Sequence, residues 1–266
     1  MSQIDQLPAG VVVVTGASRG LGRELVNQLR QRGRPVIAVV RRIESCTLPA
    51  DDDDLQLVEA DLSTPAGIEA AIEGIELALG ARSIAALVNG AGAVTPVGPL
   101  VAHSSNAMTA ALTLMAIAPA RLSVALAQRM LPAVRVLNLS TRSAHETFPG
   151  LSLYCMSKHA LHSVSRSLQL ECSATMAVAE LIPGEVDTDM QADLRTPDPA
   201  DFEMAAFFRM NQPNLIPTEL AVAFIAWVLL DTLPEDYART DPWYVYDASI
   251  HHEWVPQGMV FNYPEP

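Results

Sequence analysis

The stretch GVVVVTGASRGLG, residues 10–22, gives the strongest indication of the fold. Its four consecutive valines are typical of a strand that is buried on both faces of a parallel sheet. A glycine-rich loop, residues 15–22, comes next, and apolar residues then recur at helical spacing until Gly33. Glycines at such a loop let a pyrophosphate approach the free N–H groups of the helix N-terminus. The stretch therefore predicts a nucleotide site, with a tight strand-to-helix turn that binds no ligand as the alternative.

Strand and helix patterns alternate along the rest of the chain. We expect further strands at residues 35–40, 55–58, 84–88, 134–139, 176–182 and 243–246. Helices are expected at 65–79, roughly 103–130, 154–172 and 217–230, with Pro119 dividing or kinking the second of these. Short joints between alternating elements predict an α/β fold, a doubly wound parallel sheet inside a three-layer α/β/α arrangement. Residues 1–266 are predicted to form a single domain.

Two segments depart from this alternation. Residues 197–217 are irregular, and their prolines bracket Phe202, Phe207 and Phe208. A linker rarely carries so many aromatic residues, so we expect the segment 190–217 to cap a ligand pocket. Residues 248–266 form a C-terminal tail that either packs against a neighbouring subunit or covers the pocket.

Composition narrows the class of protein. Of 266 residues, 50% are apolar and 18% charged, which favours a folded domain over disorder. The formal charge of −13 argues against nucleic acid or an anionic membrane surface as partner. The start of the chain has no basic leader, and the apolar runs fall short of the ~20 residues of a membrane span, so we expect a soluble, cytoplasmic protein. Unpaired cysteines and the adjacent histidines 251 and 252 predict no metal site.

A tyrosine and a lysine four residues apart give the strongest chemical signal. Tyr154 and Lys158 would share one face of a helix, about 5–6 Å apart at Cβ. A neighbouring cation is expected to lower the tyrosine pKa from its usual ~10, which would make the phenol a usable proton donor near neutral pH. This spacing arises often by chance, and it gains weight here from the independent glycine loop.

Four motifs together resemble those of the short-chain dehydrogenase/reductase family over nearly the whole chain. Besides the glycine loop and the Tyr-Lys pair, they are NGAG at 89–92 and PGEVDT at 183–188. The resemblance implies a Rossmann-type fold, a homodimer or homotetramer formed through the two long helices, and a small-molecule substrate. The cofactor-binding residues it implies are Gly16, Ser18, Arg19, Gly20, Leu21, Gly22, Asp61, Leu62, Asn89, Gly90, Ala91, Gly92, Tyr154, Lys158, Pro183, Gly184, Val186 and Thr188.

Charge at the end of the second strand indicates which nicotinamide cofactor binds. An enzyme that uses NAD would place a carboxylate there to hold the ribose hydroxyls. This chain has Arg41 and Arg42 instead, and Arg19 is expected to face the same region. Guanidinium groups suit a 2′-phosphate, so NADP(H) is the expected cofactor. A solvated arginine pair is the alternative.

The resemblance also implies the reaction. Tyr154 would give a proton to a carbonyl oxygen, Lys158 would hold the nicotinamide ribose, and a loop hydroxyl would orient the carbonyl. Thr141 occupies the family's serine position, with Ser140 and Ser143 as substitutes. Two departures stand out, because Met115 replaces an asparagine used in proton relay and Gly90 replaces a second asparagine.

Local similarities narrow the expected substrate. The run 183–191 and the ending YVYD, residues 244–247, are similar to those of sepiapterin reductases and bacterial benzil reductases. The leading prediction is an NADPH-dependent carbonyl reductase acting on a ketone, a vicinal dicarbonyl or a pterin side-chain carbonyl, with Ser143 and Asp247 as candidate substrate contacts. The alternatives are an alcohol dehydrogenase that works oxidatively and an NADP-binding regulatory protein with little or no turnover.

Overall fold

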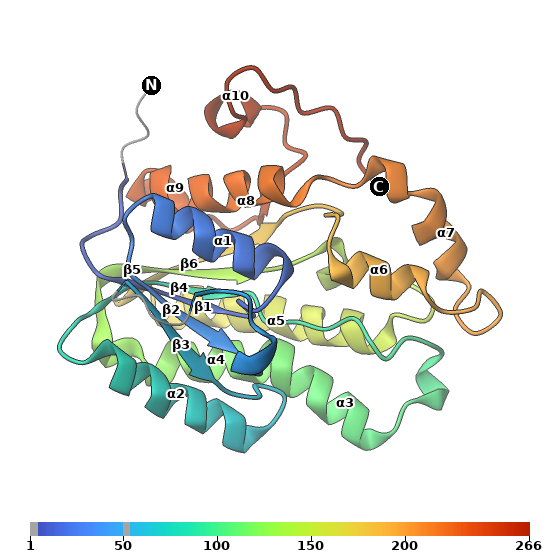
Figure 1. The fold of residues 1–266 in the computed structure, drawn as a ribbon, viewed down its shortest axis with the longest axis horizontal. Helices are drawn as coiled ribbons and strands as arrows, with labels where there is room; N and C mark the ends of the chain where they lie inside the picture. Colours follow the sequence, from blue (N-terminus) through green and yellow to red (C-terminus); the bar gives the residue numbers. More distant parts are fainter. Residues whose placement is uncertain (1–4, 50–53) are drawn as a thin grey trace.

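A seven-stranded parallel sheet forms the centre of the computed structural model, which describes residues 5–49 and 54–266 (Figure 1). The spatial order of the strands is β3-β2-β1-β4-β5-β6-β7. Their bounds are β1 Val11–Thr15, β2 Val36–Val40, β3 Leu55–Glu59, β4 Ile84–Asn89, β5 Met130–Leu139, β6 Met176–Ile182 and β7 Trp243–Tyr244. The direction of winding reverses between β1 and β4, and ligands bind at such a point, beyond the carboxyl ends of the strands. The predicted doubly wound fold is confirmed.

Helices cover both faces of the sheet. Their bounds are α1 Gly20–Gln31, α2 Pro65–Leu79, α3 Ser105–Leu112, α4 Ala118–Ala125, α5 Ser152–Glu171, α6 Asp189–Arg195, α7 Met204–Met210, α8 Thr218–Ala226, α9 Pro234–Tyr237 and α10 His251–Trp254. In β1, Val12 and Val14 pack with α1 and α8, whereas Val11 and Val13 pack with α2 and α4. The valine run is therefore buried on both sides, as its sequence predicts.

The long helix expected at 103–130 is divided, but not at Pro119. A π-helical turn, Thr113–Ile117, joins α3 to α4, and Pro119 lies in the first turn of α4. Proline cannot donate to the carbonyl four residues earlier and crowds it, and the wider turn before it accommodates that break. The helix α4 ends at Ala125, a 3₁₀ turn follows at Ala127–Arg129, and β5 begins at Met130, four residues earlier than predicted.

The segment Ser105–Ala125 also bears on the membrane expectation. It is 21 residues long with a hydropathy of 1.5 in its most apolar window, so by length and composition it is able to cross a membrane. The expectation that all apolar stretches are too short was therefore wrong for this segment. It is weak evidence, because core helices of soluble proteins pass the same test, and 39% of the window is buried here.

Close backbone packing shapes the glycine loop. Thr15 Oγ1 accepts hydrogen bonds from the N–H groups of Gly90 and Ala91, at 3.1 and 3.2 Å, which joins the loop after β1 to the loop after β4. Gly16 has a φ of +72°, and Gly22 in α1 packs directly on its carbonyl. A Cβ added at Gly22 would lie 2.3 Å from the oxygen of Gly16, so only glycine fits there.

The Gly22→Ala variant tests this packing. Alanine is favoured in a helix by about 1 kcal/mol, but overpacking against backbone costs about 1–3 kcal/mol or more, so we expect a net loss in the free energy of unfolding. Gly92→Ala is the matched control, because its Cβ would lie 3.7 Å from Met115 Sδ, an ordinary contact. Urea denaturation of both variants measures the difference, and equal stability of the two would contradict the packing described.

Candidate active site

A cavity of about 570 Å³ opens beyond the carboxyl ends of the strands. One part of it is lined by the glycine loop and by the segments that follow β2, β3 and β4. The other part is lined by the segment after β5 and by α5, α6 and α7. The cavity thus lies at the edge of the sheet where the winding reverses.

Most of the expected cofactor residues line this cavity. They are Gly16, Ser18, Arg19, Gly20, Leu21, Gly22, Arg41, Asp61, Leu62, Gly90, Ala91, Gly92, Tyr154, Lys158, Pro183, Gly184, Val186 and Thr188. Arg42 and Asn89 are not brought to it. Arg42 is exposed beside the cavity, and Asn89 is buried, with its Nδ2 donating to Asn138 Oδ1 at 2.8 Å. In this structure Asn89 therefore braces β4 against β5.

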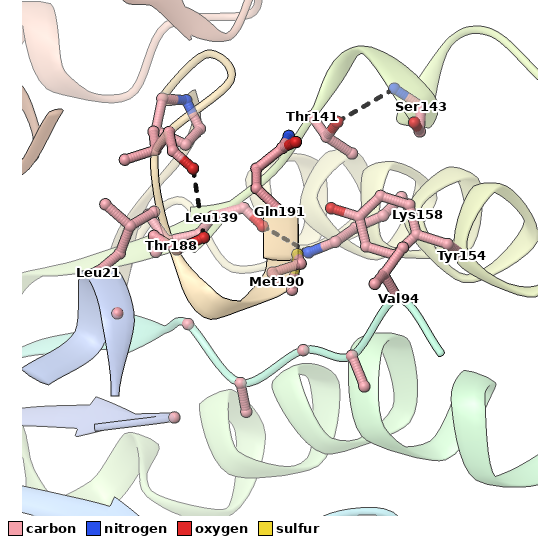
Figure 2. A pocket seen from close by; sticks show the side chains of 18 of the residues that line it. Leu21, Val94, Leu139, Thr141, Ser143, Tyr154, Lys158, Thr188, Met190 and Gln191 are labelled. Carbon is pink, nitrogen blue, oxygen red and sulfur yellow. Dashed lines mark hydrogen bonds between the residues drawn. The ribbon is translucent and has the colours of Figure 1, made fainter. Parts of the chain in front are cut away.

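Tyr154, Lys158 and Thr141 meet where the two parts of the cavity join (Figure 2). Lys158 is buried, and its Nζ donates to the carbonyl of Leu139 at 2.7 Å. The same nitrogen lies 5.8 Å from the centre of the Tyr154 ring. Thr141 Oγ1 accepts from the N–H of Ser143 at 3.3 Å, and its hydroxyl lies close enough to affect the pKa of Tyr154. One helix and one strand end thus bring the three predicted catalytic groups together.

Burial, rather than the neighbouring cation, governs the acidity of these groups. It raises the pKa of Tyr154 to about 12, and the nearby hydroxyl of Thr141 opposes that rise. Burial also lowers the pKa of Lys158 to about 8, with the charge of Glu180 opposing. The expected lowering of the tyrosine pKa by Lys158 was therefore wrong for the protein alone, because desolvation of the phenolate outweighs the lysine.

The second part of the cavity is apolar. The cap segment contributes α6 and α7 to its wall, and Val94 and Leu151 lie opposite in the same lining. The apolar lining residues here are Val94, Phe148, Leu151, Met190, Leu194, Met204, Phe207 and Phe208. Of the segment 190–217, which the sequence predicts to cap a ligand pocket, the residues that line the cavity are Met190, Gln191, Leu194, Met204, Phe207 and Phe208.

The C-terminal tail returns to the rim of this apolar part. Arg142 donates to the main-chain oxygen of Pro266, and Tyr244 donates to Glu265 at 2.9 Å. Phe261 packs against the rings of His251, Trp254, Tyr246 and Tyr263. Pro266 and Arg142 both line the cavity, so the end of the tail forms part of the pocket wall.

Ser143 lies in the cavity wall, but Asp247 does not. Asp247 Oδ1 instead accepts from the N–H and the hydroxyl of Ser249, at 3.1 and 2.5 Å. The last strand ends at Tyr244, and Asp247 belongs to the turn that precedes α10. The structure therefore does not bring the expected pterin contact to the site.

Two buried polar atoms in the wall have no hydrogen-bond partner within the described residues. They are Ser140 Oγ and Gln191 Oε1, and both residues line the cavity. A buried polar atom without a partner costs about 1–3 kcal/mol, so these atoms are suited to contact a polar ligand. Met115, by contrast, is buried behind Gly92 and offers no polar group to a proton relay.

Comparison with known proteins agrees with this geometry. The family model of the short chain dehydrogenases matches residues 10–199. The chain is 46% identical over 67 residues to coniferyl-alcohol dehydrogenase of Pseudomonas sp. strain HR199. This match covers 25% of this chain and 24% of the relative. It is 34% identical over 103 residues to retinol dehydrogenase 5 of Homo sapiens, and this match covers 35% of this chain and 30% of the relative. The matches thus span less than a third of these relatives.

This chain is similar to one solved structure over the whole length of that structure. The crystal structure of the KRED1-Pglu enzyme superposes with a TM-score of 0.77 at 27% identity, with 89% of this chain and 100% of that chain covered. The fold, the motifs in their order and the match over more than half of the chain lead to one conclusion. The chain belongs to the short-chain dehydrogenase family.

Proposed function

We propose that this protein is a cytoplasmic, NADPH-dependent carbonyl reductase that acts on a ketone or a vicinal dicarbonyl. The observation that carries the proposal is the meeting of Tyr154, Lys158 and Thr141 between a glycine-lined and an apolar part of one cavity. Membership of the short-chain dehydrogenase family supports oxidoreductase chemistry with a nicotinamide cofactor.

The glycine-lined part fits a dinucleotide. A Cβ at Gly20, whose φ is +54°, would lie 3.5 Å from Cγ2 of Thr188, so the loop and Thr188 face each other closely. The N-terminus of α1 directs free N–H groups and a positive dipole end toward this region. The backbone of residues 16–22 would hold the pyrophosphate, and Thr188 would lie beside the nicotinamide.

Arg41 supports NADPH over NADH. It is exposed in the cavity lining directly after β2, where a carboxylate would repel a 2′-phosphate. Arg19 is less free to serve, because its guanidinium lies 3.6 and 3.7 Å from the carboxylates of Asp189 and Asp193. Arg42 is exposed outside the lining.

The chemistry follows from the catalytic groups. The cofactor, when bound, supplies the hydride. Tyr154 donates its proton to the carbonyl oxygen of the substrate, and the Thr141 hydroxyl, which lies in the same part of the cavity wall, orients that oxygen. The Lys158 ammonium stabilises the phenolate that is left and binds the nicotinamide ribose.

The apolar wall supports a substrate with hydrophobic substituents. Phe148, Phe207 and Phe208 favour an aryl or alkyl ketone, and a vicinal diketone adds a second oxygen that can accept from the Ser140 hydroxyl. A pterin substrate is less favoured, because Asp247 is turned to Ser249. Assembly as a homodimer or homotetramer is part of the proposal, supported by the exposed side chains of Ile117, Val124 and Leu170 on the two long helical regions.

The first test is consumption of NADPH with a panel of aryl and alkyl diketones. Replacement of the proton donor in Tyr154→Phe is expected to lower kcat by about 10²- to 10⁴-fold, the usual contribution of general acid catalysis. Tyr263→Phe, outside the cavity lining, is the matched control and should keep full activity. NADPH binding without turnover of any substrate would favour a sensor, and turnover of alcohols alone would favour an oxidative dehydrogenase.

The pH dependence tests the role of Lys158. Tyr154 stays protonated up to about pH 12, whereas the charged form of Lys158 is lost as pH rises through about 8. Hence kcat/KM for NADPH, which reports the free enzyme, should be level below pH 7 and fall by about tenfold per pH unit above 8. In Lys158→Arg the guanidinium stays charged, so any remaining activity should not show this fall. A wild-type profile that stays level from pH 7 to 10 would refute the assignment.

Cofactor preference tests Arg41. Loss of a hydrogen bond between charged groups costs about 1.5–3 kcal/mol, so Arg41→Ala should raise the KM for NADPH by roughly 10- to 100-fold and leave that for NADH nearly unchanged. Arg42→Ala is the matched control, because the guanidinium of Arg42 is next to Arg41 in sequence but lies outside the cavity lining. Equal effects of the two variants would show that general surface charge, not Arg41, selects the cofactor.

A further inference from the structure

A second group of chemically active side chains lies outside the cavity. His145, His162 and Glu180 come from the turn after β5, from α5 and from β6. Each offers one ligand atom, and these atoms all lie within 4.8 Å of one another. None of the three lines the cavity, although the charge of Glu180 acts on Lys158 in the cavity wall.

Glu180 is the unusual member of this group. Its side chain is 4% exposed, and one oxygen, Oε2, lies 2.7 Å from His162 Nδ1. The other oxygen, Oε1, is buried and has no hydrogen-bond partner in the described parts of the chain. A buried carboxylate oxygen without a partner carries a desolvation cost, which a cation would remove.

The two histidines complete a set of metal ligands. Their rings meet edge to face with centroids 4.6 Å apart, and His145 is exposed, so an ion has a route from solvent. Ligands of tetrahedral zinc lie about 3.4 Å apart, given bonds of about 2.1 Å. The ligand atoms of the three residues lie within 4.8 Å of one another, so small side-chain rotations bring them to that spacing. Two of the residues lie on a helix and a strand, and the third lies on a short turn.

We propose that His145, His162 and Glu180 bind a Zn²⁺ ion, with water in the remaining position. Two imidazoles and one carboxylate form a ligand set that zinc uses in proteins, and no thiolate is needed. The competing interpretation is a proton shared between His162 and Glu180, an ordinary ion pair that leaves His145 without a role.

The ion would hold together the structural elements that carry the catalytic groups. His162 lies one turn after Lys158 on α5, His145 lies four residues after Thr141, and Glu180 lies on β6, the strand that leads to Pro183. Zinc bound there would cross-link three segments behind the cavity without touching substrate. Its role is therefore structural, and its expected effect is on the stability of the fold.

Isothermal titration of the metal-free full chain with ZnCl₂ tests the proposal. We expect one ion per chain and a rise in Tm of a few degrees at saturation, because a ligand that binds the native state stabilises it. The variants His145→Ala and His162→Ala should each weaken binding by at least roughly 10-fold, since loss of even an outer partner of a metal ligand costs that much. Anomalous scattering at the zinc edge would locate the ion.

The control is His252→Ala, an exposed histidine of the tail that should leave zinc affinity unchanged. Both ligand variants are checked by circular dichroism without metal, so that loss of folding is distinguished from loss of binding. His145 is exposed, and its alanine variant is expected to fold. The proposal is overturned if no zinc binds at micromolar concentration, or if zinc affinity is unchanged in both ligand variants.

Discussion

The hydrogen bond from the buried ammonium of Lys158 to the carbonyl of Leu139 is the interaction on which the site depends. It fixes α5 to the carboxyl end of β5 at the edge of the sheet where the winding reverses. Tyr154 lies one turn earlier on the same helix, and Thr141 lies two residues beyond that carbonyl. A single contact between a helix and a strand therefore sets the relative positions of the three residues that we propose to be catalytic.

Burial gives this arrangement its chemical character. A phenol with a raised pKa keeps its proton at neutral pH, which suits a group that must donate it. Burial lowers the pKa of Lys158, so the positive charge beside the phenol is lost at a lower pH than that of a lysine in water. The apolar cap and the returning tail surround the same region with Phe207, Phe208 and Pro266, and exclusion of water there strengthens each polar contact.

Sequence alone predicted the features that depend on local patterns. The valine run, the glycine loop and the four-residue spacing of Tyr154 and Lys158 fix nearby geometry, and the structure agrees with them. The sequence could not predict that Asp247 would accept from Ser249, because a half-buried turn residue has many possible partners. The cluster of His145, His162 and Glu180 was missed for a related reason, since its members are distant in sequence and only the fold brings them together. The cation effect on Tyr154 was misjudged because burial cannot be read from spacing.

A crystal structure with NADPH and an unreactive ketone analogue tests the central claim most directly. We expect the carbonyl oxygen within about 3 Å of both the Tyr154 and the Thr141 hydroxyls, with the nicotinamide on the glycine-lined side and the substituents against the apolar wall. A ketone oxygen bound away from Tyr154, or a dinucleotide placed outside the glycine loop, would contradict it.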